Sequence, residues 1–191
     1  MRAPRGVAWL AALALLLGLA GGCASPRPTA TPCAVPTPRD TSPASSGRPT
    51  HAYPDLEDLI PTDIGCQILQ SASVVSDPSL QDPKTLRVLS RLGRTAADLE
   101  VATAGSAAVD VTIDALRVVG ATGPAAAAAF QAEDQGDPTT TSVYGTATIA
   151  GKSVSTRTTA SETEYIYAIG SVMFVVSGSA TLVAEAIGKL P

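Results

Sequence analysis

Apolar residues follow three different patterns along this chain. From Val7 to Leu19 they form a nearly unbroken run of 13 residues. Residues 24–52 show no apolar periodicity and contain seven prolines, a composition that favours an extended chain without a core. From residue 53 onward, apolar positions recur with the periods of strands and helices. The patterns therefore predict an N-terminal segment (1–22), a tether (23–52) and one folded domain (53–191).

Strands are predicted in the domain wherever apolar and polar residues alternate. Val111 and Ile113, for example, alternate with Asp110, Thr112 and Asp114, which predicts one buried face and one face of solvated side chains. The predicted strands cover residues 64–75, 97–104, 109–119, 142–150, 152–159, 163–169 and 172–176.

Four helices are predicted from their apolar spacing and their N-terminal caps. Asp82 followed by Pro83 is a strong helix start, and Thr122 and Ser179 occupy the same position before two later helices. The predicted helices cover residues 55–60, 82–92, 122–132 and 179–190.

These elements predict an α+β fold, with a mostly antiparallel sheet and helices packed on one side of it. The segments 98–105 and 163–170 each end in glycine, and each precedes a strand with a valine pair, a glycine and a helix. This parallel suggests a βββα unit used twice, with an extra helix in the first copy. Chance likeness between two hairpins explains the parallel equally well.

The N-terminal segment has the layout of a secretory signal peptide, because Arg2 and Arg5 precede the apolar run and small residues follow it. An uncleaved signal anchor is the alternative, although a membrane span needs about 20 apolar residues. The closing sequence Ala20-Gly-Gly-Cys23 resembles the lipobox of bacterial lipoprotein precursors, with Ala20 where leucine is usual. The resemblance implies that Cys23 carries a diacylglyceryl group, that cleavage occurs before Cys23, and that its new amino group is acylated, for example with palmitate. Such a chain is anchored by lipid to the extracytoplasmic side of the cell membrane.

Two further cysteines are Cys33 in the tether and Cys66 in the domain. An extracytoplasmic compartment permits disulfides, so we predict a Cys33–Cys66 bond that fixes the end of the tether to the domain. In the alternative interpretation, Cys66 is a buried apolar residue and Cys33 has no structural role.

The domain is acidic, because residues 53–191 carry 8 basic and 16 acidic side chains, a net charge of −8. Nucleic acid is therefore not an expected partner, since phosphate neutralisation needs lysine and arginine. One face of the helix 82–92 and its end is nevertheless basic, with Lys84, Arg87, Arg91 and Arg94. This face is a candidate anion contact. A solvated helix face with cations near its C-terminal end is the simpler alternative.

Residue patterns for catalysis or metal binding are scarce. The single histidine, His51, precedes the domain, and the chain has no G-x-S-x-G, S-x-x-K or H-E-x-x-H pattern. The acidic stretch 133–137 matches no full calcium loop. We therefore expect no enzyme activity, no cofactor and no metal site.

The expected function is that of a membrane-anchored binding domain that contacts an envelope protein or polymer. The alternative is a carrier of a lipid or another hydrophobic molecule in the cell envelope. The domain also resembles exported domains of GC-rich, actinobacterial-type bacteria, a likeness that implies no particular ligand.

Overall fold

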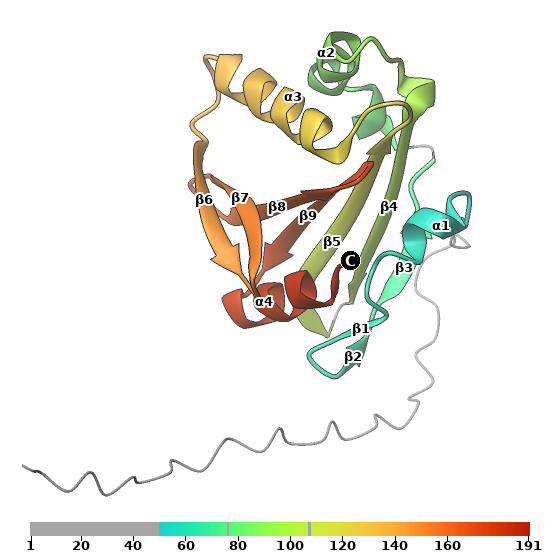
Figure 1. Ribbon diagram of the computed structural model, residues 1–191, viewed down its shortest axis with the longest axis vertical. Coiled ribbons are helices and arrows are strands. Elements are labelled where there is room, and N and C mark those ends of the chain that lie inside the picture. Colours follow the sequence, from blue (N-terminus) through green and yellow to red (C-terminus); the bar gives the residue numbers. More distant parts are fainter. Residues whose placement is uncertain (1–49, 76, 107) are drawn as a thin grey trace, which may run out of the picture. The chain divides into compact units, whose positions relative to one another are not determined.

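The computed structural model describes residues 50–75, 77–106 and 108–191 (Figure 1). The predicted N-terminal segment (1–22) and all but the last residues of the tether (23–52) lie outside this part of the chain. The described part contains one seven-stranded sheet, one two-stranded hairpin and four α-helices.

The large sheet is antiparallel throughout, and its strand order is β3-β4-β5-β9-β8-β7-β6. Two meanders meet at the central pair, β5 and β9. The strands are β3 (Gln70–Ser73), β4 (Leu99–Ser106), β5 (Val109–Val118), β6 (Val143–Ile149), β7 (Lys152–Thr158), β8 (Thr163–Ile169) and β9 (Val172–Gly178).

Successive side chains of each strand point to opposite faces of the sheet. On β9, Phe174 and Val176 belong to the main core, whereas Met173 and Val175 line a cleft on the other side. We call these two sides the α4 face and the cleft face.

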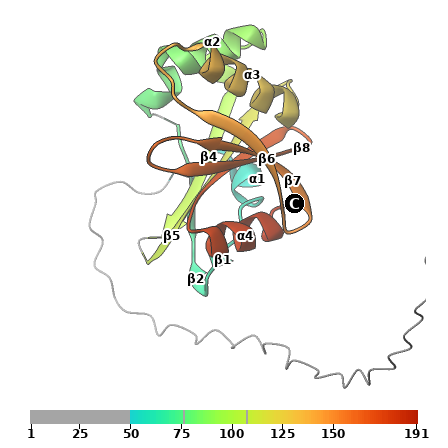
Figure 2. The same ribbon diagram turned by 90° about the vertical axis from the view of Figure 1, so that its left-hand side faces the viewer.

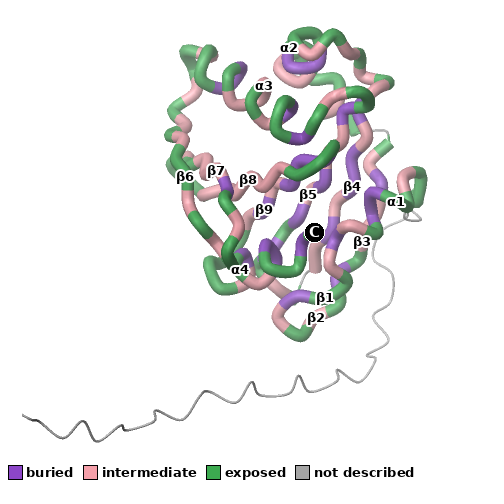
Figure 3. The backbone as a smooth tube through the Cα atoms, viewed as in Figure 1, coloured by how far each residue is buried: buried purple, intermediate pink, exposed green. Residues whose placement is uncertain are grey.

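The α4 face carries the larger core. Helix α4 (Ala180–Lys189) packs Val183 and Ile187 against Phe174 of the sheet, and all three side chains are fully buried. Figure 3 shows the buried positions concentrated on β4, β5 and β9. Each fully buried side chain of this size stabilises the fold by about 1.5–3 kcal/mol.

A short helix and a hairpin complete the α4 face beside β3. Helix α1 (Pro54–Glu57) and the strands β1 (Asp63–Ile64) and β2 (Gln67–Ile68) contribute Leu56 and Ile64 to the same core.

The cleft face is covered by the other two helices, as Figure 2 shows from the side. Asp82 caps α2 (Pro83–Arg91) by accepting the backbone N–H groups of the first turn, and Thr122 caps α3 (Gly123–Gly136) in the same way. A 3₁₀ helix, η1 (Pro78–Gln81), leads into α2.

A second core on the cleft face joins these helices to the sheet. Leu89 of α2 and Ala126 of α3 pack with Leu99, Val101 and Val118 of the strands. This core fixes the helices over one end of β4 and β5.

The predicted α+β class and antiparallel sheet are confirmed. The helices, expected on one side, lie on both: α1 and α4 cover one face, and α2 and α3 cover the other. The reason is that the central strands carry apolar side chains on both faces, so each face needs a covering layer.

The proposed repeat extends only to the strands. The hairpins β4–β5 and β8–β9 are each followed by a helix, as predicted. However, α3 packs on the cleft face and α4 on the opposite face. A whole βββα unit is therefore not repeated.

The turn between β1 and β2 consists of Gly65 and Cys66, with φ angles of 57° and 62°. Positive φ at both central residues is typical of a type I′ hairpin turn. Cys66 is exposed at the tip of this hairpin. The alternative interpretation of Cys66 as a buried apolar residue is therefore wrong.

Candidate ligand-binding cleft

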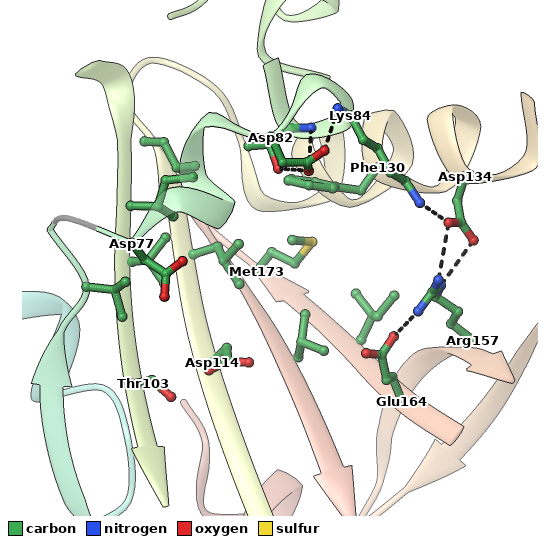
Figure 4. Close-up of a pocket in the computed structure, with 18 of the residues that line it drawn as sticks. Asp77, Asp82, Lys84, Thr103, Asp114, Phe130, Asp134, Arg157, Glu164 and Met173 are labelled. Atoms are coloured by element: carbon green, nitrogen blue, oxygen red, sulfur yellow. Dashed lines mark hydrogen bonds and ion pairs between the residues drawn. The ribbon is translucent and has the colours of Figure 1, made fainter. Parts of the chain in front are cut away.

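A cleft of about 540 Å³ lies between the sheet and the helices α2 and α3 (Figure 4). Small-molecule sites typically measure about 300–1,000 Å³. The floor is formed by side chains from six strands of the sheet, and the roof by η1, α2 and α3.

Strand register sorts the floor into rows of decreasing apolarity. The row nearest the second core is apolar: Val101, Leu116 and Met173. The middle row is mixed: Thr103, Asp114, Val175 and Ile166. The outer row is polar: Glu164, Arg157 and Tyr144. The cleft thus has an apolar end under the helices and a polar end on the open sheet.

Asp134 of α3 holds the roof to the polar row. It is buried and forms ion pairs with Lys84 of α2 and with Arg157 Nε at 3.0 Å, and it accepts a hydrogen bond from Tyr144 Oη at 3.0 Å. Burial alone would raise the pKa of this carboxyl, but these donors outweigh burial and hold the pKa well below its usual range. Burial and the neighbouring Asp134 raise the pKa of Tyr144 to about 12.

Glu164 shares the same guanidinium. Arg157 Nη1 lies 2.8 Å from Glu164 Oε2, and the pKa of Arg157 is raised by its hydrogen bonds to Asp134 and Glu164. The two cations of the cleft, Lys84 and Arg157, are therefore already paired with carboxylates of the cleft.

Asp114 lies in the middle row without such a partner. Thr103 of β4 lies opposite it in the strand register, and no Lys or Arg among the described residues forms an ion pair with it. Burial, together with the charge of Glu164, raises the pKa of Asp114. The prediction that Asp114 is simply solvated is wrong, although Asp110, on the same face, is exposed.

The predicted anion-contact face is largely an internal contact. Arg87 pairs with Glu133, Arg91 Nη2 lies 2.9 Å from Glu133 Oε2, and Lys84 pairs with Asp134. Arg94 donates from Nη2 to the backbone oxygen of Gly120 at 2.8 Å. Contact with an external anion stays a prediction, and such an anion would compete with the carboxylates of α3.

The predicted lipidation and disulfide sites lie mainly beyond the described part of the chain. Cys23 and Cys33 both belong to the residues that the structure leaves out. Cys66 takes part in a disulfide, and the described residues contain no second cysteine. The pairing of Cys66 with Cys33 stays a prediction.

A separate polar cluster surrounds Glu57 at the start of the domain. The buried Glu57 accepts hydrogen bonds from His51 Nδ1 at 2.5 Å and from the Ser73 hydroxyl. Burial would raise the pKa of Glu57, but these two donors lower it overall. Because the carboxylate stands between serine and imidazole, the histidine does not contact the hydroxyl as a general base must.

Two further properties of the described residues concern metal ions and the membrane. No group of three or more His, Cys, Asp or Glu side chains there is arranged to hold a metal ion. No helix in that part of the chain combines the length and apolarity needed to cross a membrane. Glu133 and Asp134 of the acidic stretch 133–137 are buried in ion pairs with α2 and β7.

Comparison with known proteins yields no relative. The chain matches no protein-family model, no curated protein and no solved structure.

Most residues of the cleft were not predicted from the sequence as site residues. Asp114, Asp134, Arg157 and Glu164 come from four separate elements, and the pairing of strands together with the packing of α3 on the sheet brings them together. One signal was present: Asp114 and Leu116 lie on the same face of one strand, where a purely solvated face would not carry leucine.

Proposed function

We propose that this chain is an exported, lipid-anchored binding protein whose cleft holds a small hydrophobic or amphiphilic molecule. The cleft itself carries the proposal: about 540 Å³ remain open over aliphatic side chains such as Leu116, Val175 and Ile166. Apolar side chains that face open space lose dispersion contacts. A bound apolar group would restore those contacts, so the cleft favours the carrier among the expected functions.

The side chains around the cleft support binding without catalysis. Asp134 and Glu164 are tied to cations, and neither a histidine nor a cysteine lines the cleft among the described residues. Contact with an envelope protein or polymer stays a prediction, because no feature of the described residues favours that function over ligand binding in the cleft.

A titration tests the binding activity. The chain from residue 24 onward contains every described residue, and it would be purified without detergent and titrated with a fluorescent probe that carries an uncharged alkyl chain. We expect saturable binding of one probe per chain. Val175→Trp fills the floor and should weaken binding by at least about 10-fold, because it removes the space for the probe. Val119→Trp, at an exposed position outside the cleft, is the matched control and should bind as wild type does.

Two results of this titration would contradict the proposed binding site. If wild type shows no saturable binding, or if Val175→Trp binds as well as Val119→Trp, the cleft is not the binding site.

The membrane anchor has its own test, which is independent of the cleft. Labelled palmitate fed to expressing bacteria should enter wild type and Cys33→Ser but not Cys23→Ser, because the lipobox resemblance assigns the lipid to Cys23. Label retained by Cys23→Ser would contradict the anchor.

A further inference from the structure

We infer that the cleft selects a cationic amphiphile, whose protonated amine pairs with Asp114 while its hydrocarbon chain lies along the apolar row under α2 and α3. This inference rests on the proposed binding function and names the class of ligand.

The lining of the cleft carries a net negative charge. Five carboxylates line it, from Asp77, Asp82, Asp114, Asp134 and Glu164, against the two cations Lys84 and Arg157. Taken as fully ionised, the lining has a net charge of −3. Walls of low polarity strengthen the field of such a lining and raise the local concentration of cations.

Most of these carboxylates already have partners within the domain. Asp134 and Glu164 pair with Lys84 and Arg157, and Asp82 accepts the backbone N–H groups of α2. An anionic ligand would have to displace carboxylates to reach either cation. A cationic ligand displaces no ion pair at Asp114, because the described residues form none with it.

Asp114 lies next to the apolar row of the floor. It lies one row from Leu116 and Met173 and beside Val175 in the register of β5 and β9. Figure 4 shows Asp114 on the strands, farther than Met173 from Lys84 and Phe130 of the roof. A charged head held there directs an attached chain toward the apolar row and Phe130 of the roof.

A cationic ligand would also lower the energetic cost of an ionised Asp114 in the cleft. Burial without a cation disfavours the ionised form of Asp114, and an ammonium group would compensate that cost with a charge-assisted hydrogen bond. Thr103, the register partner of Asp114 on the neighbouring strand, adds a polar side chain beside it.

The experiment compares three ligands with the same ten-carbon chain: decylamine, which is protonated at pH 7, decanol and decanoate. Each would be titrated calorimetrically, below its micellar concentration, into the chain from residue 24 onward. We expect decylamine to bind at least about 10-fold more tightly than decanol, and decanoate most weakly, because an ion pair in a partly desolvated site favours the cation.

Two variants locate the head group. Asp114→Asn should weaken decylamine binding by about 10-fold and leave decanol binding within about 2-fold, since only the ion pair is lost. Asp110→Asn removes the same charge from the same strand and the same face, at an exposed position outside the cleft, and should leave both affinities unchanged.

The outcomes separate this inference from the function on which it rests. If all three ligands bind alike, or if Asp114→Asn and Asp110→Asn weaken decylamine binding equally, the cation selectivity is wrong and the binding function stands. Tighter binding of decanoate would also overturn the inference. If none of the three binds, the proposed function fails with it.

Discussion

Asp114 occupies a position where a carboxylate weakens the fold. Its side chain is half-buried beside Thr103 and Val175, and its raised pKa means that the folded chain binds a proton there more readily than the unfolded chain does. The ionised side chain therefore destabilises the domain at neutral pH. Residues that cost stability are characteristic of functional positions, so stability is an informative measurement at this site.

Replacing Asp114 with asparagine should stabilise the domain. At pH 7 we expect the free energy of unfolding to rise by about 0.5–1 kcal/mol, because a poorly solvated charge is removed. The gain should shrink as the pH falls through the raised pKa of Asp114, since the wild-type carboxyl is then neutral in the fold. Urea unfolding between pH 3 and 8 measures both effects. Asp110→Asn should change stability by less than about 0.5 kcal/mol, and a loss of stability in Asp114→Asn would contradict this account.

Asp134 should behave in the opposite way. Its carboxylate is buried against Lys84, Arg157 and Tyr144, so Asp134→Ala removes the partner of Lys84 and one of the two partners of Arg157. We expect a loss of about 2–4 kcal/mol at pH 7, measured by urea unfolding. The exposed pair Glu185–Lys189 is the control, and Glu185→Gln should cost less than about 1 kcal/mol.

The pH dependence of the Asp134 effect follows from its lowered pKa. A carboxylate with a lowered pKa in the fold contributes stability above the pKa of the unfolded chain and loses it as the pH falls. The difference between wild type and Asp134→Ala should therefore be constant above about pH 5 and decrease below about pH 4, near the usual pKa of aspartate. A difference that does not change in this range would show that the ion pairs contribute little.

At the scale of elements, the contact between α3 and β9 depends on a missing side chain. A Cβ atom at Gly123, the first residue of α3, would lie 2.1 Å from the backbone oxygen of Val172. Gly123→Ala must therefore push the helix away from the strand. We expect a loss of about 1–3 kcal/mol in thermal or urea unfolding, together with weaker probe binding, because α3 forms the roof of the cleft.

Gly136 provides the control in the same helix. No atom lies within 4 Å of a Cβ atom built there, so Gly136→Ala should leave stability unchanged or raise it by up to about 1 kcal/mol through helix propensity. If the two variants behaved alike, the close approach of α3 to β9 would not be the cause.

Local chemistry made most elements predictable from sequence. Asp82 and Thr122 cap α2 and α3 as expected, whereas Ser179 precedes α4 without forming a capping hydrogen bond. The segment 64–75, predicted as one strand, is divided into short strands because Gly65 and Cys66 adopt a tight turn. Helix α3 continues to Gly136, past its predicted end at residue 132, because cations of other elements pair with Glu133 and Asp134.

The candidate site was less predictable than the fold. Alternation places Asp114 and Val175 on a face of their strands, but it does not reveal that β5 and β9, about 60 residues apart in sequence, are neighbours. The rows of the cleft depend on that pairing. Partner strands are selected by the packing of the whole sheet, which no local pattern encodes.

At the scale of the whole molecule, the acidic domain holds most of its basic side chains in internal ion pairs. Five basic residues belong to the predicted face or line the cleft, and four of them pair with carboxylates: Lys84, Arg87, Arg91 and Arg157. The fifth, Arg94, donates to a backbone oxygen instead. The remaining acidic surplus supports a preference for cationic over anionic partners.

The attachment of the tether to the domain gives the last prediction. Cys66 is exposed at the tip of the β1–β2 hairpin and takes part in a disulfide, and a bond to Cys33 would close a loop of about 33 residues. Such a loop stabilises a domain by about 3–4 kcal/mol, mainly by restricting the unfolded chain.

Cys33→Ser, Cys66→Ser and the double variant should therefore lose the same amount of unfolding free energy, because each removes one shared bond. Wild type in reducing agent should match them, and non-reducing peptide mapping should recover residues 33 and 66 in one linked fragment. Unequal losses that add in the double variant would show that the two cysteines act separately, and the domain would then be joined to its tether by the backbone alone.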